Sequence, residues 1–123
     1  MKKFIAVFLA LICLCLSACD SVDLEYYSNT NVPTFTCVTK IEASEKNYLS
    51  SVGAYVYVYH CKEEKQEQFI NKYIDYLKKE QGYTVVESDD GYQMITLAKD
   101  NAGVIISVAD SQTVHVMPYK RSV

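Results

Sequence analysis

The chain has 123 residues, and its twelve Lys and Arg against fifteen Asp and Glu give a net charge of −3. This length is typical of one domain, and the acidic balance disfavours nucleic acid and anionic lipid headgroups as partners, because both require basic patches. The aromatic content is unusual, with eleven tyrosines and no tryptophan.

Residues 1–18 have the organisation of a secretory signal peptide. Lys2 and Lys3 precede an uninterrupted apolar stretch, Phe4–Leu16. This stretch is shorter than the roughly 20 residues that a membrane-spanning helix needs, but it suits the apolar core of a signal peptide. The sequence therefore predicts that this segment is cleaved.

The four residues Leu16-Ser17-Ala18-Cys19 resemble the lipobox of bacterial lipoproteins. The resemblance implies cleavage between Ala18 and Cys19 and transfer of a diacylglyceryl group to the Cys19 thiol. Each buried acyl CH₂ contributes about 0.8 kcal/mol, so two or three chains hold a protein stably at a membrane. The alternative is an ordinary secreted protein in which Cys19 merely follows the cut. We expect a lipid-anchored protein on the extracytoplasmic side of the cell membrane.

Loss of the signal peptide removes two lysines, so the net charge of the remaining chain is −5. Residues 19–31 are rich in Ser, Asn and Thr without sustained periodicity, which predicts a lipidated N-terminus and a flexible tether. We expect a single domain over residues 32–123, long enough to bury about two-thirds of its unfolded surface.

Two cysteines remain in the predicted domain, Cys37 and Cys61. Alternating side chains predict two strands here, Thr34–Ile41 and Tyr48–Cys61, joined by a polar connection. In an antiparallel hairpin of these strands the two cysteines would face each other closely enough for a disulfide, and a non-cytosolic compartment favours that bond. Two free buried thiols are the alternative.

An amphipathic helix is predicted over Lys62–Gln81, closed by Gly82, because one apolar stripe runs along it: Phe69, Ile70, Tyr73, Ile74 and Leu77. Four further strands follow as a meander: Tyr83–Glu87, Tyr92–Lys99, Val104–Ala109 and Thr113–Tyr119. Pro118 marks the last of them as an edge strand or as ending there. The predicted fold class is α+β, with one antiparallel sheet in the order ββαββββ and the helix on one face.

One helix can cover only one face of such a sheet. We expect the covered face to carry the β-branched and leucine residues: Val56, Val58, Ile95, Leu97, Val104, Ile106, Val108, Val114 and Val116. The other face would carry a candidate binding face: Tyr55, Tyr57, Tyr59, His115, Met117 and Tyr119. Exposed amphipathic patches usually mark contact sites, and tyrosine suits them. A second small core and a reversed assignment of the faces are the alternatives.

The sequence predicts no catalytic residue, metal site or cofactor. Nucleophilic catalysis needs a positioned base, and His60 and His115 lie on different predicted strands with no nucleophile motif nearby. His60 and Cys61 alone cannot supply the three or four ligands that zinc needs. Aspartates in the predicted turns have local hydrogen-bonding roles and lack EF-hand spacing.

The remainder of the chain resembles uncharacterised small lipoproteins of low-GC gut bacteria. The resemblance lies in the Val-Pro-x-Phe opening (Val32–Phe35), one helix ending in Gly-Tyr, and the meander. It implies no activity and no site residue. We therefore expect a binding module for an envelope protein or a glycan, not an enzyme. The alternative is a structural subunit that self-associates through the tyrosine-rich face.

Overall fold

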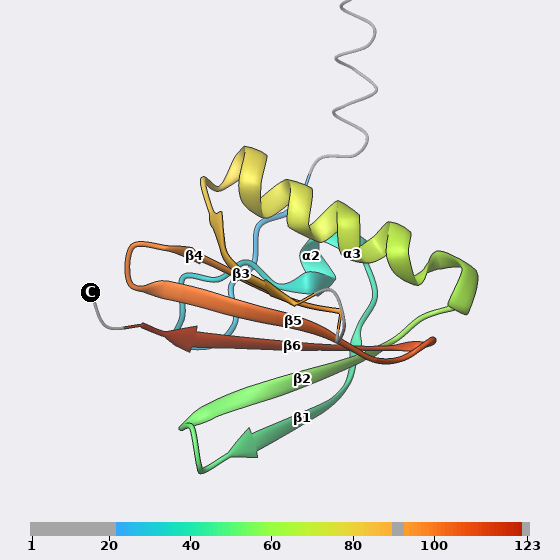
Figure 1. The fold of residues 1–123 in the computed structure, drawn as a ribbon, viewed down its shortest axis with the longest axis horizontal. Coiled ribbons are helices and arrows are strands. Elements are labelled where there is room, and N and C mark those ends of the chain that lie inside the picture. The colour runs from blue at the N-terminus through green and yellow to red at the C-terminus, as the bar shows by residue number, and fades with distance from the viewer. Residues whose placement is uncertain (1–21, 90–92, 122–123) are drawn as a thin grey trace, which may run out of the picture.

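The structure is a computed structural model that describes residues 22–89 and 93–121 (Figure 1). The predicted signal peptide, its cleavage site at Ala18 and Cys19, and the lipidation of Cys19 lie outside these residues. No helix among the described residues is long and apolar enough to cross a membrane.

A six-stranded antiparallel sheet forms the centre of the fold, in the order β1-β2-β6-β5-β4-β3. Its strands are β1 (Ala43–Leu49), β2 (Ala54–His60), β3 (Thr84–Asp89), β4 (Met94–Lys99), β5 (Ala102–Asp110) and β6 (Thr113–Lys120). After β2 the chain crosses to the far edge, and the meander β3 to β6 returns until β6 pairs with β2. The α+β class and the four-stranded meander are confirmed.

The predicted long helix is present as one continuous helical segment on one face of the sheet (Figure 1). It comprises a 3₁₀ turn (Glu63–Lys65), helix α3 (Gln66–Asp75) and a π-helical turn (Tyr76–Glu80). Its apolar stripe faces the sheet, with Tyr73 and Leu77 fully buried. Gly82 ends the segment at φ +78°, a conformation that favours glycine.

The predicted strand Thr34–Ile41 is wrong, because this segment forms a short helix, α2 (Phe35–Thr39). The hydroxyl of Thr34 accepts a hydrogen bond from the backbone N–H of Cys37 at 3.0 Å, which is a helix N-cap. The first strand is instead β1, in the segment predicted to be a polar connection. Every residue of β1 is exposed, and a polar sequence with charges suits such an edge strand.

Because Cys37 lies in α2, the strand register that supported its pairing with Cys61 is wrong. Both cysteines are free thiols in the structure. The buried Cys37 thiol instead donates to the carbonyl oxygen of Thr34 at 3.2 Å. The geometric argument for a disulfide between Cys37 and Cys61 therefore does not hold.

Residues 22–31, predicted to belong to a tether, pack against the domain. The backbone N–H of Tyr27 donates to Val32 O at 3.0 Å, and Tyr26 forms a β-bridge with Pro33. The buried Tyr27 hydroxyl lies 2.6 Å from that of Tyr59. The Tyr27 side chain thus anchors this segment to the domain. The Ser, Asn and Thr residues around it had predicted a flexible tether.

The register between β2 and β6 reverses the expected faces of β2. Tyr57 lies opposite Val116 and Tyr59 opposite Val114, so these tyrosines share the helix-covered face with the valines. Tyr59 is only 1% exposed. The faces expected for the other strands are confirmed by the buried core residues: Leu97, Val104, Ile106, Val114 and Val116. Alternation within β2 alone could not distinguish its two faces, because both carry apolar side chains.

The last strand is interior, contrary to one reading of Pro118. β6 lies between β2 and β5, and Pro118 pairs with Val104 of β5. On the other side, the pairing with β2 ends at Val116, so Pro118 lies beyond that ladder. The missing N–H of proline is tolerated where the strand has no partner on one side.

Candidate functional site

The six residues of the predicted binding face do not form one surface. Tyr57 and Tyr59 lie on the helix-covered face, with the Tyr57 ring 4.3 Å from that of Tyr27 between centroids. His115 pairs with Val58 on the opposite, uncovered face. By strand alternation Met117 and Tyr119 share that face with His115. Tyr59 is therefore core, Tyr57 is half-buried beside it, and Tyr55 is exposed near the end of the hairpin. The remaining three residues form a separate, half-buried surface: His115, Met117 and Tyr119.

Two exposed tyrosines lie together at the tip of the β1–β2 hairpin. Tyr48 and Tyr55 are paired across the strands with ring centroids 5.0 Å apart, and Leu49 and Val52 beside them are also exposed. β2 pairs with β6 only from Tyr57 onward, and the hairpin diverges from β6 toward this tip (Figure 1). We call these four residues the hairpin tip.

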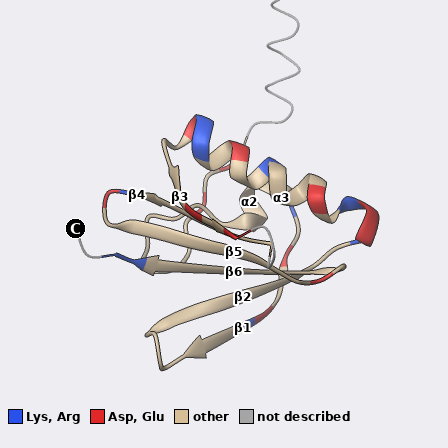
Figure 2. Cartoon of the chain, in the orientation of Figure 1, with Lys and Arg blue, Asp and Glu red and all other residues tan. Residues whose placement is uncertain are grey.

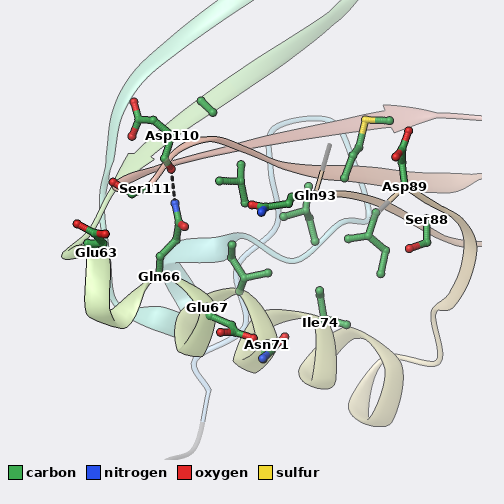
Figure 3. A pocket seen from close by; sticks show the side chains of 16 residues that line it. Glu63, Gln66, Glu67, Asn71, Ile74, Ser88, Asp89, Gln93, Asp110 and Ser111 are labelled. Atoms are coloured by element: carbon green, nitrogen blue, oxygen red, sulfur yellow. Dashed lines mark hydrogen bonds between the residues drawn. The ribbon is translucent and has the colours of Figure 1, made fainter. Parts of the chain in front are cut away.

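A groove of about 960 Å³ lies between α3 and the strands β3 to β5 (Figure 3). This size is at the upper end of the range of ligand pockets, about 300–1,000 Å³. Its floor is aliphatic: Ile70, Ile74, Met94, Ile95, Ile106 and Val108. Ile70 and Ile74 come from the helix at i, i+4 spacing, so they lie on one face of it and reach the groove together. We call this feature the α3 groove.

Acidic side chains surround the groove from several elements. Glu63 and Glu67 belong to the helical segment, Asp89 ends β3, and Asp110 ends β5 (Figures 2 and 3). No lysine or arginine is among the described lining residues. Hydrogen bonds from the backbone N–H of Gln112 and from the Thr113 side chain lower the pKa of Asp110, so its negative charge persists under mildly acidic conditions. The rim is anionic and the floor is apolar.

One end of the groove is fixed by Gln66, at the start of α3. Its amide nitrogen donates to the carbonyl oxygen of Asp110 at 2.6 Å and to that of Thr113 at 3.2 Å. Figure 3 shows the bond to Asp110 joining the helix to the β5–β6 turn. The groove walls are therefore tied together where the helix begins.

The groove is suited to holding a ligand by contact and charge. Over the described ranges, no group of three His, Cys, Asp or Glu side chains is arranged to hold a metal ion. The two histidines lie elsewhere: His60 and His115 are on the uncovered face, and the ring of His60 lies 3.3 Å from the Thr113 hydroxyl. Neither histidine lines the groove.

The groove could not be predicted from the sequence, because its lining comes from segments far apart in the chain. The acidic first turns of the helix were visible, but acidic residues there also complement the helix dipole. The aliphatic residues Ile95, Ile106 and Val108 were predicted as layer beneath the helix. The structure shows that α3 crosses the strands and leaves part of this apolar layer uncovered.

Comparisons of the chain with protein-family models, with curated proteins and with solved structures give no match.

Proposed function

We propose that the chain is a lipid-anchored extracytoplasmic lipoprotein that acts as a binding module, and that the α3 groove takes a basic, aliphatic segment of an envelope protein. The lipobox at Leu16–Cys19 supports the anchor. The observation that carries the binding proposal is the anionic rim above an aliphatic floor. Lysine or arginine side chains of a partner complement such a rim, and leucine or isoleucine side chains bury against the floor.

Several features favour a polypeptide segment over a small molecule. The groove lies between one helix and three strands, and its acidic residues come from both walls. Charges spread along a groove complement a ligand that carries several cations in sequence. Rim charges of this kind contribute mainly to association rate and specificity, while the buried aliphatic anchors contribute most of the affinity.

The test is site-specific photocrosslinking in cells that express the full-length chain. A photoreactive residue replaces Asn71, which lines the groove, and in the control it replaces its neighbour Lys72, which is exposed on α3 but does not line the groove. We expect a discrete adduct from position 71 and none from position 72. Mass spectrometry should place the crosslink in a partner segment that contains Lys or Arg together with Leu or Ile.

Charge reversal then tests the basis of recognition. In the chain that carries the photoreactive residue at position 71, Glu67→Lys should reduce the yield of adduct at least tenfold. The new lysine places a positive charge on the rim, where it repels the Lys and Arg side chains of the partner. Gln68→Lys is the matched control, since Gln68 is exposed on the same helix and does not line the groove. Equal adducts from positions 71 and 72, or an acidic partner segment, would contradict the proposal.

The hairpin tip supports a second candidate, self-association. Its four exposed apolar residues form a preformed aromatic pair with flanking aliphatic side chains, as interface anchors often do. Both sheet edges, in contrast, carry β-bulges and charges, which disfavour open-ended strand pairing between copies. Sedimentation of the full-length chain in nanodiscs, with and without the substitution Tyr48→Ser, distinguishes the two candidates. Self-association that Tyr48→Ser abolishes would favour a contact between copies of the chain.

A further inference from the structure

Two adjoining hollows lie at the opposite end of the sheet from the α3 groove. One, of about 360 Å³, is lined in part by Asn29, Tyr119 and Lys120. The other, of about 230 Å³, is lined in part by Tyr26 and Lys99. Asn31 and Asn101 line both of them, so the hollows meet at this pair of amides. We call the combined feature the amide hollow.

The backbone of each shared asparagine is held in place from elsewhere in the fold. The carbonyl oxygen of Asn31 accepts a hydrogen bond from the Tyr83 hydroxyl at 3.0 Å, and that of Asn101 accepts one from the backbone N–H of Arg121 at 2.8 Å. Neither side-chain amide has a hydrogen-bond partner among residues 22–89 and 93–121. Two residues with fixed backbones thus line one hollow with side-chain amides that no described residue uses.

An aromatic ring lies at each side of these amides. Tyr26 is 46% exposed, and its backbone is bridged to Pro33. Tyr119 is held against the sheet, because its ring lies directly over Gly103. Tyr26 lines one of the two hollows and Tyr119 the other, and each is an amphipathic side chain.

We propose that the amide hollow is a saccharide-binding site. A sugar hydroxyl is both donor and acceptor, and each asparagine amide offers two donors and one acceptor with two lone pairs, so the two groups match. The apolar face of a sugar ring packs on an exposed tyrosine ring. Lys99 and Lys120 line the hollow together with one acidic residue, Asp100, so its lining has a net positive charge. The two lysines have no ion pair within the described part of the chain, and they favour a sugar that carries a carboxylate. The site is separate from the α3 groove, and neither proposal depends on the other.

The test uses the full-length chain in nanodiscs, which avoids detergents that carry sugar headgroups. Calorimetric titration with a galacturonic acid tetramer and with a neutral galactose tetramer should detect binding of both, with the acidic tetramer about tenfold tighter. In Asn31→Ala/Asn101→Ala the affinity for either tetramer should fall at least about tenfold, because two or more hydrogen bonds of about 1 kcal/mol are lost.

Asn47→Ala is the matched control, since Asn47 is an exposed asparagine on β1 that lines neither hollow. It should bind both tetramers as the unchanged chain does. Circular dichroism of the double variant checks that its fold is retained, and Tyr26→Ala supplies an independent variant that leaves both amides in place and should also weaken binding. Absence of binding to both tetramers by the folded, unchanged chain would overturn the proposal, as would equal affinity of the double variant.

Discussion

At the scale of single residues, the Tyr27 hydroxyl is a junction in the core. It accepts a hydrogen bond from the backbone N–H of Phe35 at 3.1 Å and lies 2.6 Å from the Tyr59 hydroxyl. Tyr27→Phe leaves the buried N–H at the start of α2 without a partner, which costs about 1–3 kcal/mol of unfolding free energy. We expect urea unfolding to show this loss as a lower midpoint with an unchanged slope.

The matched variant is Tyr59→Phe. It removes the other hydroxyl of the pair but keeps the bond between Tyr27 and Phe35, so it should cost only about 0.5–1.5 kcal/mol. A larger loss of unfolding free energy in Tyr59→Phe than in Tyr27→Phe would contradict this explanation. It would show that the hydrogen bond from the N–H of Phe35 is not the main contribution of the Tyr27 hydroxyl to stability.

At the scale of elements, β5 and β6 approach closely where Gly103 lies beneath Tyr119. A Cβ at position 103 would overlap with Cζ of the Tyr119 ring. Gly103→Ala should therefore lower the unfolding free energy by about 1–3 kcal/mol, the usual cost of overpacking. Thermal unfolding followed by circular dichroism measures this change.

Removing the ring tests the cause. In a Tyr119→Ala background the same Gly103→Ala change should cost less than about 0.5 kcal/mol, so the two substitutions are strongly coupled. Equal costs in both backgrounds would assign the requirement for glycine to the backbone of β5 instead of the ring above it.

The sequence predicted an element correctly where neighbouring residues alone determine it. The stripe of α3, the Gly82 cap and the strands of the meander were predicted, because periodicity and turn residues specify them within a few positions. α2 was missed because Phe35–Thr39 alternates like a strand, while Thr34 supplies an N-cap that favours a helix. The faces of β2 were reversed because its partner β6 lies more than fifty residues away, and only that register places Tyr59 opposite Val114.

The candidate sites were harder to predict for the same reason. The α3 groove combines residues between Glu63 and Ser111 from one helix and several strands, and the amide hollow combines residues from the two halves of the chain. In the sequence, Asn31 belonged to a segment predicted as tether and Asn101 to a turn, and no local pattern joins them. The predicted tyrosine face failed as a surface because Tyr27 and Phe35 cover it, and the tether hypothesis had removed Tyr27 from consideration.

At the scale of the whole molecule, the buried tyrosines make stability depend on alkaline pH. Burial raises the pKa of Tyr59 and of Tyr83 to about 12, and it raises the pKa of Tyr27 and Tyr73 as well. The folded state therefore retains protons that the unfolded state loses near pH 10. We expect a stability that is fully present below about pH 10 and falls as the pH rises toward about 12.

Urea unfolding at a series of pH values from 8 to about 11 measures this decline. Tyr59→Phe should be less stable than the unchanged chain at pH 8 but should show a shallower loss above about pH 10, because one proton-linked group is gone. Parallel curves for the two chains would exclude Tyr59 from the alkaline transition.

The position of β6 also orders the events of folding. β6 comes last in sequence among the described strands, yet it joins the β1–β2 hairpin to the β3–β5 ladder. A nascent chain that lacks residues 113–120 holds two separate pieces of sheet, each with part of its apolar face uncovered. The domain can therefore complete its core only after this strand has been synthesised.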